Sequence, residues 1–370
     1  MTAVALDTGT LTRLTRHVAL EEIPPSEDLF SAAELADAVA RAQEPPLDLL
    51  VGGDVMLGGR AKRLLADHGS DYAFTATQPL LARATRVLAN LEGPLARHAG
   101  KQDRRFSYRV APATARALAR AGVSLVTLAN NHLMDCGREG VLETLEVLAG
   151  AGVGAVGAGV DRRAAHRPAI FDGPGGKVGV LGYYWNRRCA ARGRLPGSAM
   201  DDERSLARDI PALRAQVDLL VVTCHWGVPY ERAPADAERA RARRAIDLGA
   251  DAVIAHHPHV IQPIEIHRGR PIFYSVGNFA FGSGNSKAEG LLVGLRRASE
   301  GLTVEVYPLY VKNRDPRVDY QPKLLRGPSA RRILDGLLER SQLAGAAQLA
   351  GAAVEREPNR LTLRLPWRSE

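Results

Sequence analysis

Several apolar runs in this chain end in a side chain that can bind a metal ion, and this pattern restricts the possible fold more than any other feature. The runs at 47–51, 86–91, 123–129, 217–223 and 251–255 are typical of strands that are buried on both faces of a sheet. The candidate ligands that follow these runs are Asp54, Glu92, Asn131, His132, His225, His257 and His259. Because the carboxyl ends of parallel strands lie along one edge of a sheet, we expect these side chains to converge. The sequence therefore predicts an α/β fold with a site at that edge.

The segment 251–259 combines an apolar run with three histidines in four positions. Pro258 favours an extended backbone, and alternate residues of an extended segment point to the same side. We therefore expect His257 and His259 to face one site and His256 to face the other way. Neutral imidazole binds zinc, iron and manganese. The alternative is a surface loop that is merely rich in histidine.

Each candidate ligand has a simpler interpretation when it is considered alone. Asp54 lies between glycines and can form a turn. Asn131 and His132 can cap the helix expected over residues 141–148, and His225 can be a structural histidine. The repetition of such residues after successive strands favours the metal site. Carboxylate, amide oxygen and imidazole together suit a divalent cation, a bridging carboxylate suits two, and the lack of thiolates argues against structural zinc.

The formal net charge of +8 does not indicate a nucleic-acid partner, because the basic residues are scattered along the chain. The three cysteines form no C-x-x-C pair, which suits a reducing compartment. No apolar run has the length of a membrane span or of a signal peptide. We therefore expect a cytoplasmic protein that binds a small-molecule or peptide substrate, and the sequence leaves its oligomeric state open.

The chain divides into three parts by pattern. Residues 1–46 read as an N-terminal extension whose helix, from Ser31 to Ala42, carries a capping box with Glu34. Residues 47–313 hold the alternating strands and helices, and we expect one of these strands over residues 271–279. Residues 314–370 read as a C-terminal appendage that contains a helix and a short terminal strand.

Six short motifs closely resemble those of the capsule or poly-γ-glutamate synthesis proteins, the CapA-like family, in order and spacing. They include Asp54-Val-Met-Leu-Gly-Gly-Arg60, Asn90-Leu-Glu-Gly-Pro94, Asn130-Asn-His132, His225-Trp-Gly227 and His256-His-Pro-His259. The sixth motif is Tyr274-Ser-Val-Gly-Asn-Phe279. The resemblance implies a relative of the calcineurin-like metallophosphoesterases, with a four-layer α/β/β/α sandwich and a metal centre at the strand ends.

The resemblance also implies roles for individual residues. Asp54 and His259 resemble ligands of a first metal ion, and Glu92 takes the place of the carboxylate that bridges two ions. Asn131, His225 and His257 resemble ligands of the second ion. His132 resembles the histidine that is not a ligand but serves the leaving group, with Asp135 orienting it. The family's metallophosphoesterase relatives carry a histidine where this chain has Met56, so the first ion loses a strong ligand.

These roles predict a hydrolase that uses one or two divalent ions, Mn, Fe or Zn, on an anionic phosphoester or a γ-glutamyl or peptide amide. Arg60, Arg109 and Trp185 can form an anion-binding and stacking pocket, with Asn278 at the end of its strand as a further substrate contact. The alternative interpretation, that these arginines are ordinary solvent-exposed residues, is equally good. The alternative function is a non-hydrolytic accessory or binding protein of capsule or poly-γ-glutamate synthesis.

Overall fold

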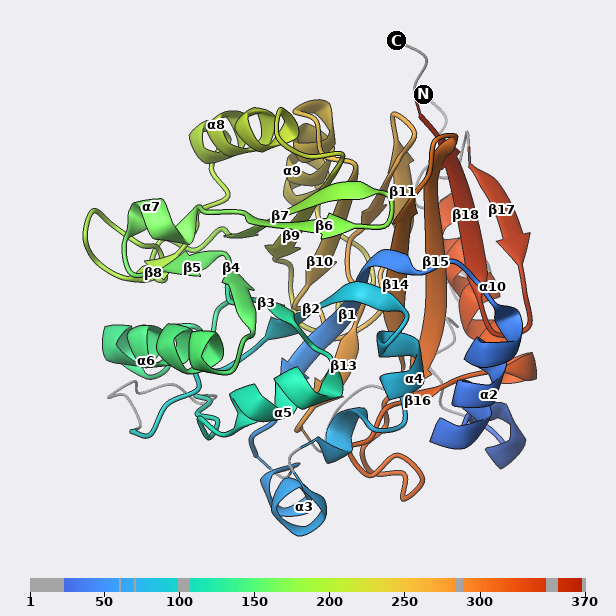
Figure 1. The fold of residues 1–370 in the computed structure, drawn as a ribbon. Helices are drawn as coiled ribbons and strands as arrows, with labels where there is room; N and C mark the ends of the chain where they lie inside the picture. Colours follow the sequence, from blue (N-terminus) through green and yellow to red (C-terminus); the bar gives the residue numbers. More distant parts are fainter. Residues whose placement is uncertain are drawn as a thin grey trace, which may run out of the picture.

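The computed structural model describes residues 23–59, 61–69, 71–98, 107–283, 289–343 and 352–367. These residues form two large sheets that pack face to face, and helices cover the outer face of each sheet (Figure 1). The arrangement confirms the expected four-layer α/β/β/α sandwich. A small third sheet joins β5 (Ala158–Gly159) to β8 (Gly197–Ser198).

The larger sheet is built around β1 (Leu47–Met56), in which every residue is buried. β1 is parallel to β2 (Ala84–Leu91) and β13 (Asn278–Phe281), and antiparallel to β14 (Glu289–Arg297). A strand buried on both faces needs apolar residues at nearly every position, which explains the apolar run at 47–51. The other strands of this sheet are β3 (Leu125–Thr127), β4 (Gly154–Val156), β15 (Gly301–Tyr310), β16 (Lys323–Leu324), β17 (Ala353–Arg356) and β18 (Leu361–Pro366).

The smaller sheet has the strand order β11-β12-β10-β9-β7-β6. Its four central strands run parallel, and β6 and β11 close the two edges antiparallel to their neighbours. The strands are β6 (Ala169–Gly173), β7 (Gly176–Tyr184), β9 (Leu219–His225), β10 (Ala252–His256), β11 (Ile264–His267) and β12 (Arg270–Phe273).

Alternate residues of the central strands point into different layers of the core. In β1, Leu49 and Val51 face the second sheet, whereas Leu50 packs against helices on the outer side. In β9, Leu219 likewise faces the first sheet and Leu220 faces outward. This alternation gives one core between the sheets and one core under each helix layer.

Two sets of helices form the outer layers. The larger sheet is covered by α2 (Ala32–Ala42), α4 (Gln78–Leu81), α5 (Thr114–Ala121) and α6 (Gly137–Gly150). The smaller sheet is covered by α8 (Glu203–Arg214) and α9 (Asp236–Asp247). The shorter or peripheral helices are η1 (Ser26–Asp28), α3 (Ala61–His68), η2 (Tyr72–Phe74) and α7 (Arg162–Ala165). Figure 1 shows α5 and α6 on one side of the sheets and α8 and α9 on the other.

The expectation of one strand over residues 271–279 was wrong. β12 belongs to the smaller sheet and β13 to the larger one, so the chain crosses between the sheets here. The crossing brings backbones into close contact: a Cβ on Gly53 would lie 2.1 Å from the Gly277 carbonyl oxygen. Gly277 also has a φ of 70°, which favours glycine. The glycines of this region therefore permit β13 to lie against β1.

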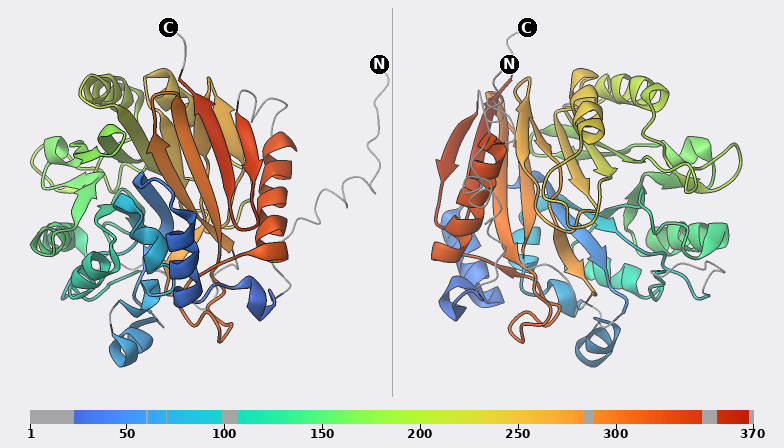
Figure 2. Two further views of the ribbon diagram at one scale, coloured as in Figure 1. Left: turned by 45° about the vertical axis from the view of Figure 1, so that its right-hand side comes forward. Right: turned by 180° about the vertical axis from the view of Figure 1, so that it is seen from behind.

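The segments at both ends of the described chain pack onto the larger sheet. The capping box of Ser31 and Glu34 is present at the start of α2, as predicted. β18 pairs with β15 along six residues, and α10 (Gly327–Leu343) contributes to the core between the sheets. Figure 2 shows α10 and the C-terminal strands together at one end of the molecule. The predicted domain boundaries stay a prediction, but the C-terminal segment extends the central sheet.

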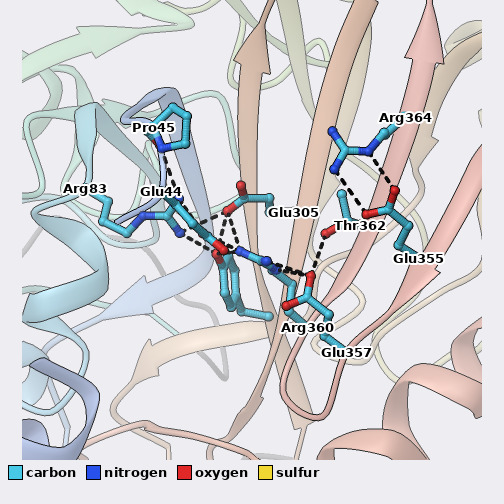
Figure 3. A network of polar contacts seen from close by, with 10 residues as sticks. Glu44, Pro45, Arg83, Glu305, Glu355, Glu357, Arg360, Thr362 and Arg364 are labelled. Atoms are coloured by element: carbon cyan, nitrogen blue, oxygen red, sulfur yellow. Dashed lines mark hydrogen bonds and ion pairs between the residues drawn. The ribbon is translucent and has the colours of Figure 1, made fainter. Parts of the chain in front are cut away.

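A buried ion network joins these segments (Figure 3). Arg83 contacts Glu305 at 3.0 Å and Glu44 at 2.8 Å, and it also donates to the Tyr307 hydroxyl. Arg360 forms ion pairs with Glu44 and Glu305 from the opposite side. The network thereby ties the chain before β1, the chain before β2, β15 and the C-terminal hairpin together. No helix in the described part of the chain is both long enough and apolar enough to cross a membrane.

Candidate metal centre

The strand ends bring the predicted ligands together. Asp54 lies within β1 and not after it, opposite Asn90 of β2 and Asn278 of β13. Glu92 directly follows β2, and His225 is the last residue of β9. All of these residues are at most 1% exposed. The sheet edge therefore carries a buried polar cluster in an otherwise apolar core.

Two groups of ligand atoms share one carboxylate. Asp54, Glu92 and His259 form one group, and Glu92, His225 and His257 form the other, with the ligand atoms of each group within 4.8 Å of one another. A carboxylate common to two groups of this kind is the arrangement that a pair of cations requires. Asn131 belongs beside the second group, because its Oδ1 lies 2.9 Å from Nε2 of His225.

Asn90 lies at the centre of the cluster and was not predicted as a site residue. Its Nδ2 lies 2.7 Å from Asp54 Oδ1, 3.3 Å from Glu92 Oε1 and 3.1 Å from His225 Nδ1. Asn130 Nδ2 donates in turn to Asn90 Oδ1 at 3.1 Å. An asparagine near the end of a buried apolar strand is the signal that could have identified Asn90. Asn90 fixes the orientation of both carboxylates.

His259 binds two partners through one nitrogen. Its Nδ1 lies 2.9 Å from Asp54 Oδ2 and 2.9 Å from Asn278 Oδ1. Burial by itself lowers the pKa of His259, but the nearby carboxylates Glu92 and Asp54 outweigh burial and raise the pKa to about 9. Asn278 thus contacts a candidate ligand, and its predicted role in substrate binding stays a prediction.

The charges of the cluster fit a bound cation. Burial raises the pKa of Glu92 well above its usual range, and the nearby charge of Asp54 raises it further. Burial lowers the pKa of His257 to about 4 and lowers the pKa of His225 well below its usual range, so that both imidazoles are neutral and can donate a lone pair. Within the described residues, Glu92 Oε2 and His257 Nδ1 are buried without a hydrogen-bond partner. A cation would satisfy both atoms and offset the carboxylate charge.

His132 and Asp135 form a dyad at the edge of the cluster. His132 Nδ1 lies 2.7 Å from Asp135 Oδ2, and the same oxygen accepts the Tyr108 backbone N–H at 2.8 Å. The Tyr108 ring packs on the imidazole with centroids 4.2 Å apart. His132 Nε2 then lies 3.8 Å from Glu92 Oε2. Tyr108, which the sequence did not indicate, holds the dyad in place from two sides.

The backbone of the histidine segment is not extended, contrary to expectation. His257 has a φ of 101° and His259 a φ of 56°, in the region that favours glycine. Such conformations cost on the order of 1–3 kcal/mol each and persist only where their surroundings hold them. The two histidines consequently join different ligand groups. His256 is fully buried, with its Nδ1 3.7 Å from Asp54 Oδ1.

The remaining predicted residues are Met56, Arg60, Arg109 and Trp185. Met56 is buried, and its Sδ accepts the Gly58 backbone N–H at 3.2 Å. Arg60 lies outside the described residues. Arg109 is exposed and donates to the Arg97 carbonyl at 2.5 Å. Trp185 is 45% exposed, one residue beyond the end of β7. The anion-binding and stacking roles of these residues stay predictions.

The sandwich and the cluster at its strand ends define an α/β protein with a candidate metal centre. The family model described as "Bacterial capsule synthesis protein PGA_cap" matches residues 48–283, which include every candidate ligand of the cluster. The chain therefore belongs to this family of bacterial capsule synthesis proteins, as its motifs predicted.

Three curated relatives support the assignment. The capsule biosynthesis protein CapA of Bacillus anthracis is 29% identical over 296 residues, which cover 77% of this chain and 72% of that protein. The PGA biosynthesis protein CapA of Bacillus subtilis is 31% identical over 237 residues, 63% of this chain and 62% of that protein. A probable polyglutamine synthesis accessory protein of Mycobacterium tuberculosis is 35% identical over 205 residues, 52% of this chain and 54% of that protein. The solved structure of TT1561 from Thermus thermophilus covers 66% of this chain at 13% identity, and its TM-score of 0.40 is too low to bear on function.

Proposed function

We propose that this protein is a metal-dependent hydrolase of an anionic substrate, either a phosphoester or a γ-glutamyl or peptide amide, in poly-γ-glutamate or specialised peptide metabolism. The observation that carries the proposal is the pair of ligand groups that share Glu92 beside the His132–Asp135 dyad. The names of the relatives from Bacillus support a substrate in capsule or PGA biosynthesis.

Six side chains would hold the cations. They are Asp54, Glu92 and His259 for the first ion and Glu92, Asn131, His225 and His257 for the second, with Asn90 orienting the set. Oxygen and imidazole donors suit Mn, Fe or Zn. When bound, divalent cations at such a site activate water for attack and neutralise the charge of an anionic substrate.

His132 has the position of a proton donor to the leaving group. Asp135 Oδ2 accepts a hydrogen bond from Nδ1–H of His132, which leaves Nε2 to exchange a proton on the side of the ligand cluster. Glu92 and Asp54 belong to the ligand groups, so the dyad is the group best placed for this step. The ring of Tyr108, tilted by 37° to the imidazole, packs against it and limits its rotation during the exchange.

Met56 makes the first ion the weaker of the two. Its thioether is a soft and weak ligand, and its sulfur is engaged by the Gly58 N–H. The second group retains two imidazoles in addition to Glu92. We therefore expect the second group to fill first.

Elemental analysis of protein purified without added metal or chelator tests the metal centre. About two equivalents of Mn, Fe or Zn per chain, falling sharply in His257→Ala, are expected for a dinuclear centre, with His98→Ala as the control at an exposed histidine. About one equivalent that rises in Met56→His would indicate a mononuclear centre. A wild-type protein that binds no metal after reconstitution would overturn the proposal of a metal-dependent hydrolase.

A substitution in the dyad distinguishes a hydrolase from an accessory protein. The name of the Mycobacterium tuberculosis relative favours the accessory function. His132→Gln should lower turnover of chromogenic phosphoesters or γ-glutamyl anilides by about 10²–10⁴-fold. It should retain the metal, since His132 belongs to neither ligand group. A binding protein would tolerate this change and depend on the ligands alone.

A further inference from the structure

A second polar cavity lies where α7, α8 and the loop around Gly193 meet. It has a volume of about 630 Å³, and none of its lining residues belongs to the metal centre. Four arginines line it, namely Arg162, Arg163, Arg167 and Arg208. A volume of this size is in the range of sites that enclose a small ligand.

A buried histidine forms part of the cavity wall. His166 is 9% exposed, and its Nδ1 lies 2.8 Å from Asp209 Oδ2. Tyr183 donates its hydroxyl to the same oxygen at 3.1 Å, and Arg208 Nε donates to the other oxygen at 2.7 Å. The Asp209 carboxylate is therefore fully engaged and fixes the imidazole. Among the described residues, His166 Nε2 has no hydrogen-bond partner. It is therefore available to a ligand that occupies the cavity.

The cavity carries an excess of positive charge. Its other carboxylate, Asp161, is engaged as the cap of α7, where it accepts the Ala164 backbone N–H at 2.6 Å. Asp202 caps α8 through the Ser205 backbone N–H at 2.8 Å. Burial raises the pKa of Asp202, but hydrogen bonds from Ser205 and then the charge of Arg162 outweigh burial and lower it. Three of the arginines, Arg162, Arg163 and Arg167, lie on α7 and on the turn that follows it. In the described part of the chain, no carboxylate forms an ion pair with any of these three.

One loop links this cavity to the metal centre. β7 ends at Tyr184, whose ring packs edge-on against His225 with centroids 5.5 Å apart. The chain continues through Trp185 to Gly193, whose carbonyl accepts the Arg162 backbone N–H at 3.0 Å. The same loop therefore borders both sites.

We propose that the cavity is a second binding site, which holds an acidic, carboxylate-bearing peptide chain outside the metal centre. Arginine binds a carboxylate through two parallel hydrogen bonds, and four arginines around one cavity suit several linked carboxylates better than one small anion. His166 Nε2 adds a fixed contact at the wall. The inference depends on the charge and shape of the cavity and does not require hydrolysis at the metal centre.

Fluorescence anisotropy with a labelled deca-γ-glutamate tests the proposal. The full chain carries His257→Ala and is kept in chelator, so that the metal centre does not contribute. Arg163→Ser/Arg167→Ser should weaken binding at least about tenfold, since two charge-assisted contacts are lost. His166→Gln should weaken it by a smaller factor. Arg41→Ser/Arg116→Ser removes the same charge from exposed positions on α2 and α5 and should change the affinity by less than about twofold.

Three outcomes would overturn the proposal. The first is equal weakening by the two double variants, which would mean attraction by net charge alone. The second is absence of binding to the decapeptide at millimolar concentration. The third is displacement of the peptide by inorganic phosphate at equal concentration, which would identify a small-anion site. Loss of turnover in the metal-centre variants leaves all three readouts unchanged, so the two proposals can fail separately.

Discussion

Asp201 is a buried carboxylate with little compensation. Its Oδ2 is buried without a hydrogen-bond partner in the described structure, and Arg241 Nε lies 3.7 Å away. Burial raises the pKa of Asp201 to about 7, although Arg241 opposes the rise. Between the ordinary pKa near 4 and this value, the folded state binds the proton and the unfolded state does not. Asp201 should therefore cost stability progressively as the pH rises from about 4 to about 7.

The free energy of unfolding of Asp201→Asn should fall less over this pH interval than that of the wild type. The difference between the two decreases should reach up to about 4 kcal/mol. Urea unfolding at several pH values measures the difference. Asp37→Asn, at an exposed position of α2, serves as the control and should follow the wild type. A difference between Asp201→Asn and the wild type that does not change with pH would contradict the prediction.

The identities of the candidate ligands could be predicted from the sequence because each follows an apolar run. Their conformations could not. Pro258 indicated an extended backbone, but the positive φ values of His257 and His259 depend on contacts with Asp54 and Asn278, far away in sequence. Asn90 could not be predicted for a similar reason, since its role depends on contacts with Asp54 of β1 and His225 of β9, far away in sequence.

At the scale of elements, the ion network of Figure 3 should be essential for stability. Arg83 is 9% exposed and Glu305 6%, so Arg83→Met would remove the nearer cation of a buried carboxylate and leave Glu305 only Arg360, at 3.5 Å, as an ion-pair partner. Removing one partner of a buried pair typically costs about 3–5 kcal/mol. The pair of Arg364 with Glu355 is about half exposed on both sides, and Arg364→Met should cost less than about 1 kcal/mol. Equal midpoints of chemical unfolding for the two variants would refute this prediction.

Most elements could be predicted because their sequence pattern is local, as in α2, β1 and β9. The sequence could not show that residues 271–279 form two strands, because one apolar run contributes a strand to each of the two sheets. Only the tight contact of Gly53 with Gly277 shows where the chain leaves one sheet for the other. Such a contact is a property of the assembled fold and leaves no local signal.

At the scale of the whole molecule, metal binding should stabilise the fold. The buried carboxylates Asp54 and Glu92 repel each other in the metal-free protein, and a cation that binds only the folded state removes this penalty. Mn or Zn at about a hundred times its dissociation constant should add about 2.7 kcal/mol to the free energy of unfolding. Thermal melts with metal and with chelator measure the effect. An unchanged melting temperature would count against the site, and His257→Ala should show a reduced increase.

The pairing of β1 with β14 has a consequence for how the protein is made. Leu49 leaves the ribosome long before its partner Leu295. One edge of β1 therefore stays unpaired while most of the chain is synthesised. An unpaired apolar edge is a template for intermolecular pairing. Nascent chains of this protein should therefore depend on chaperones until β14 emerges, and premature termination before that strand should yield aggregates and not a smaller folded domain.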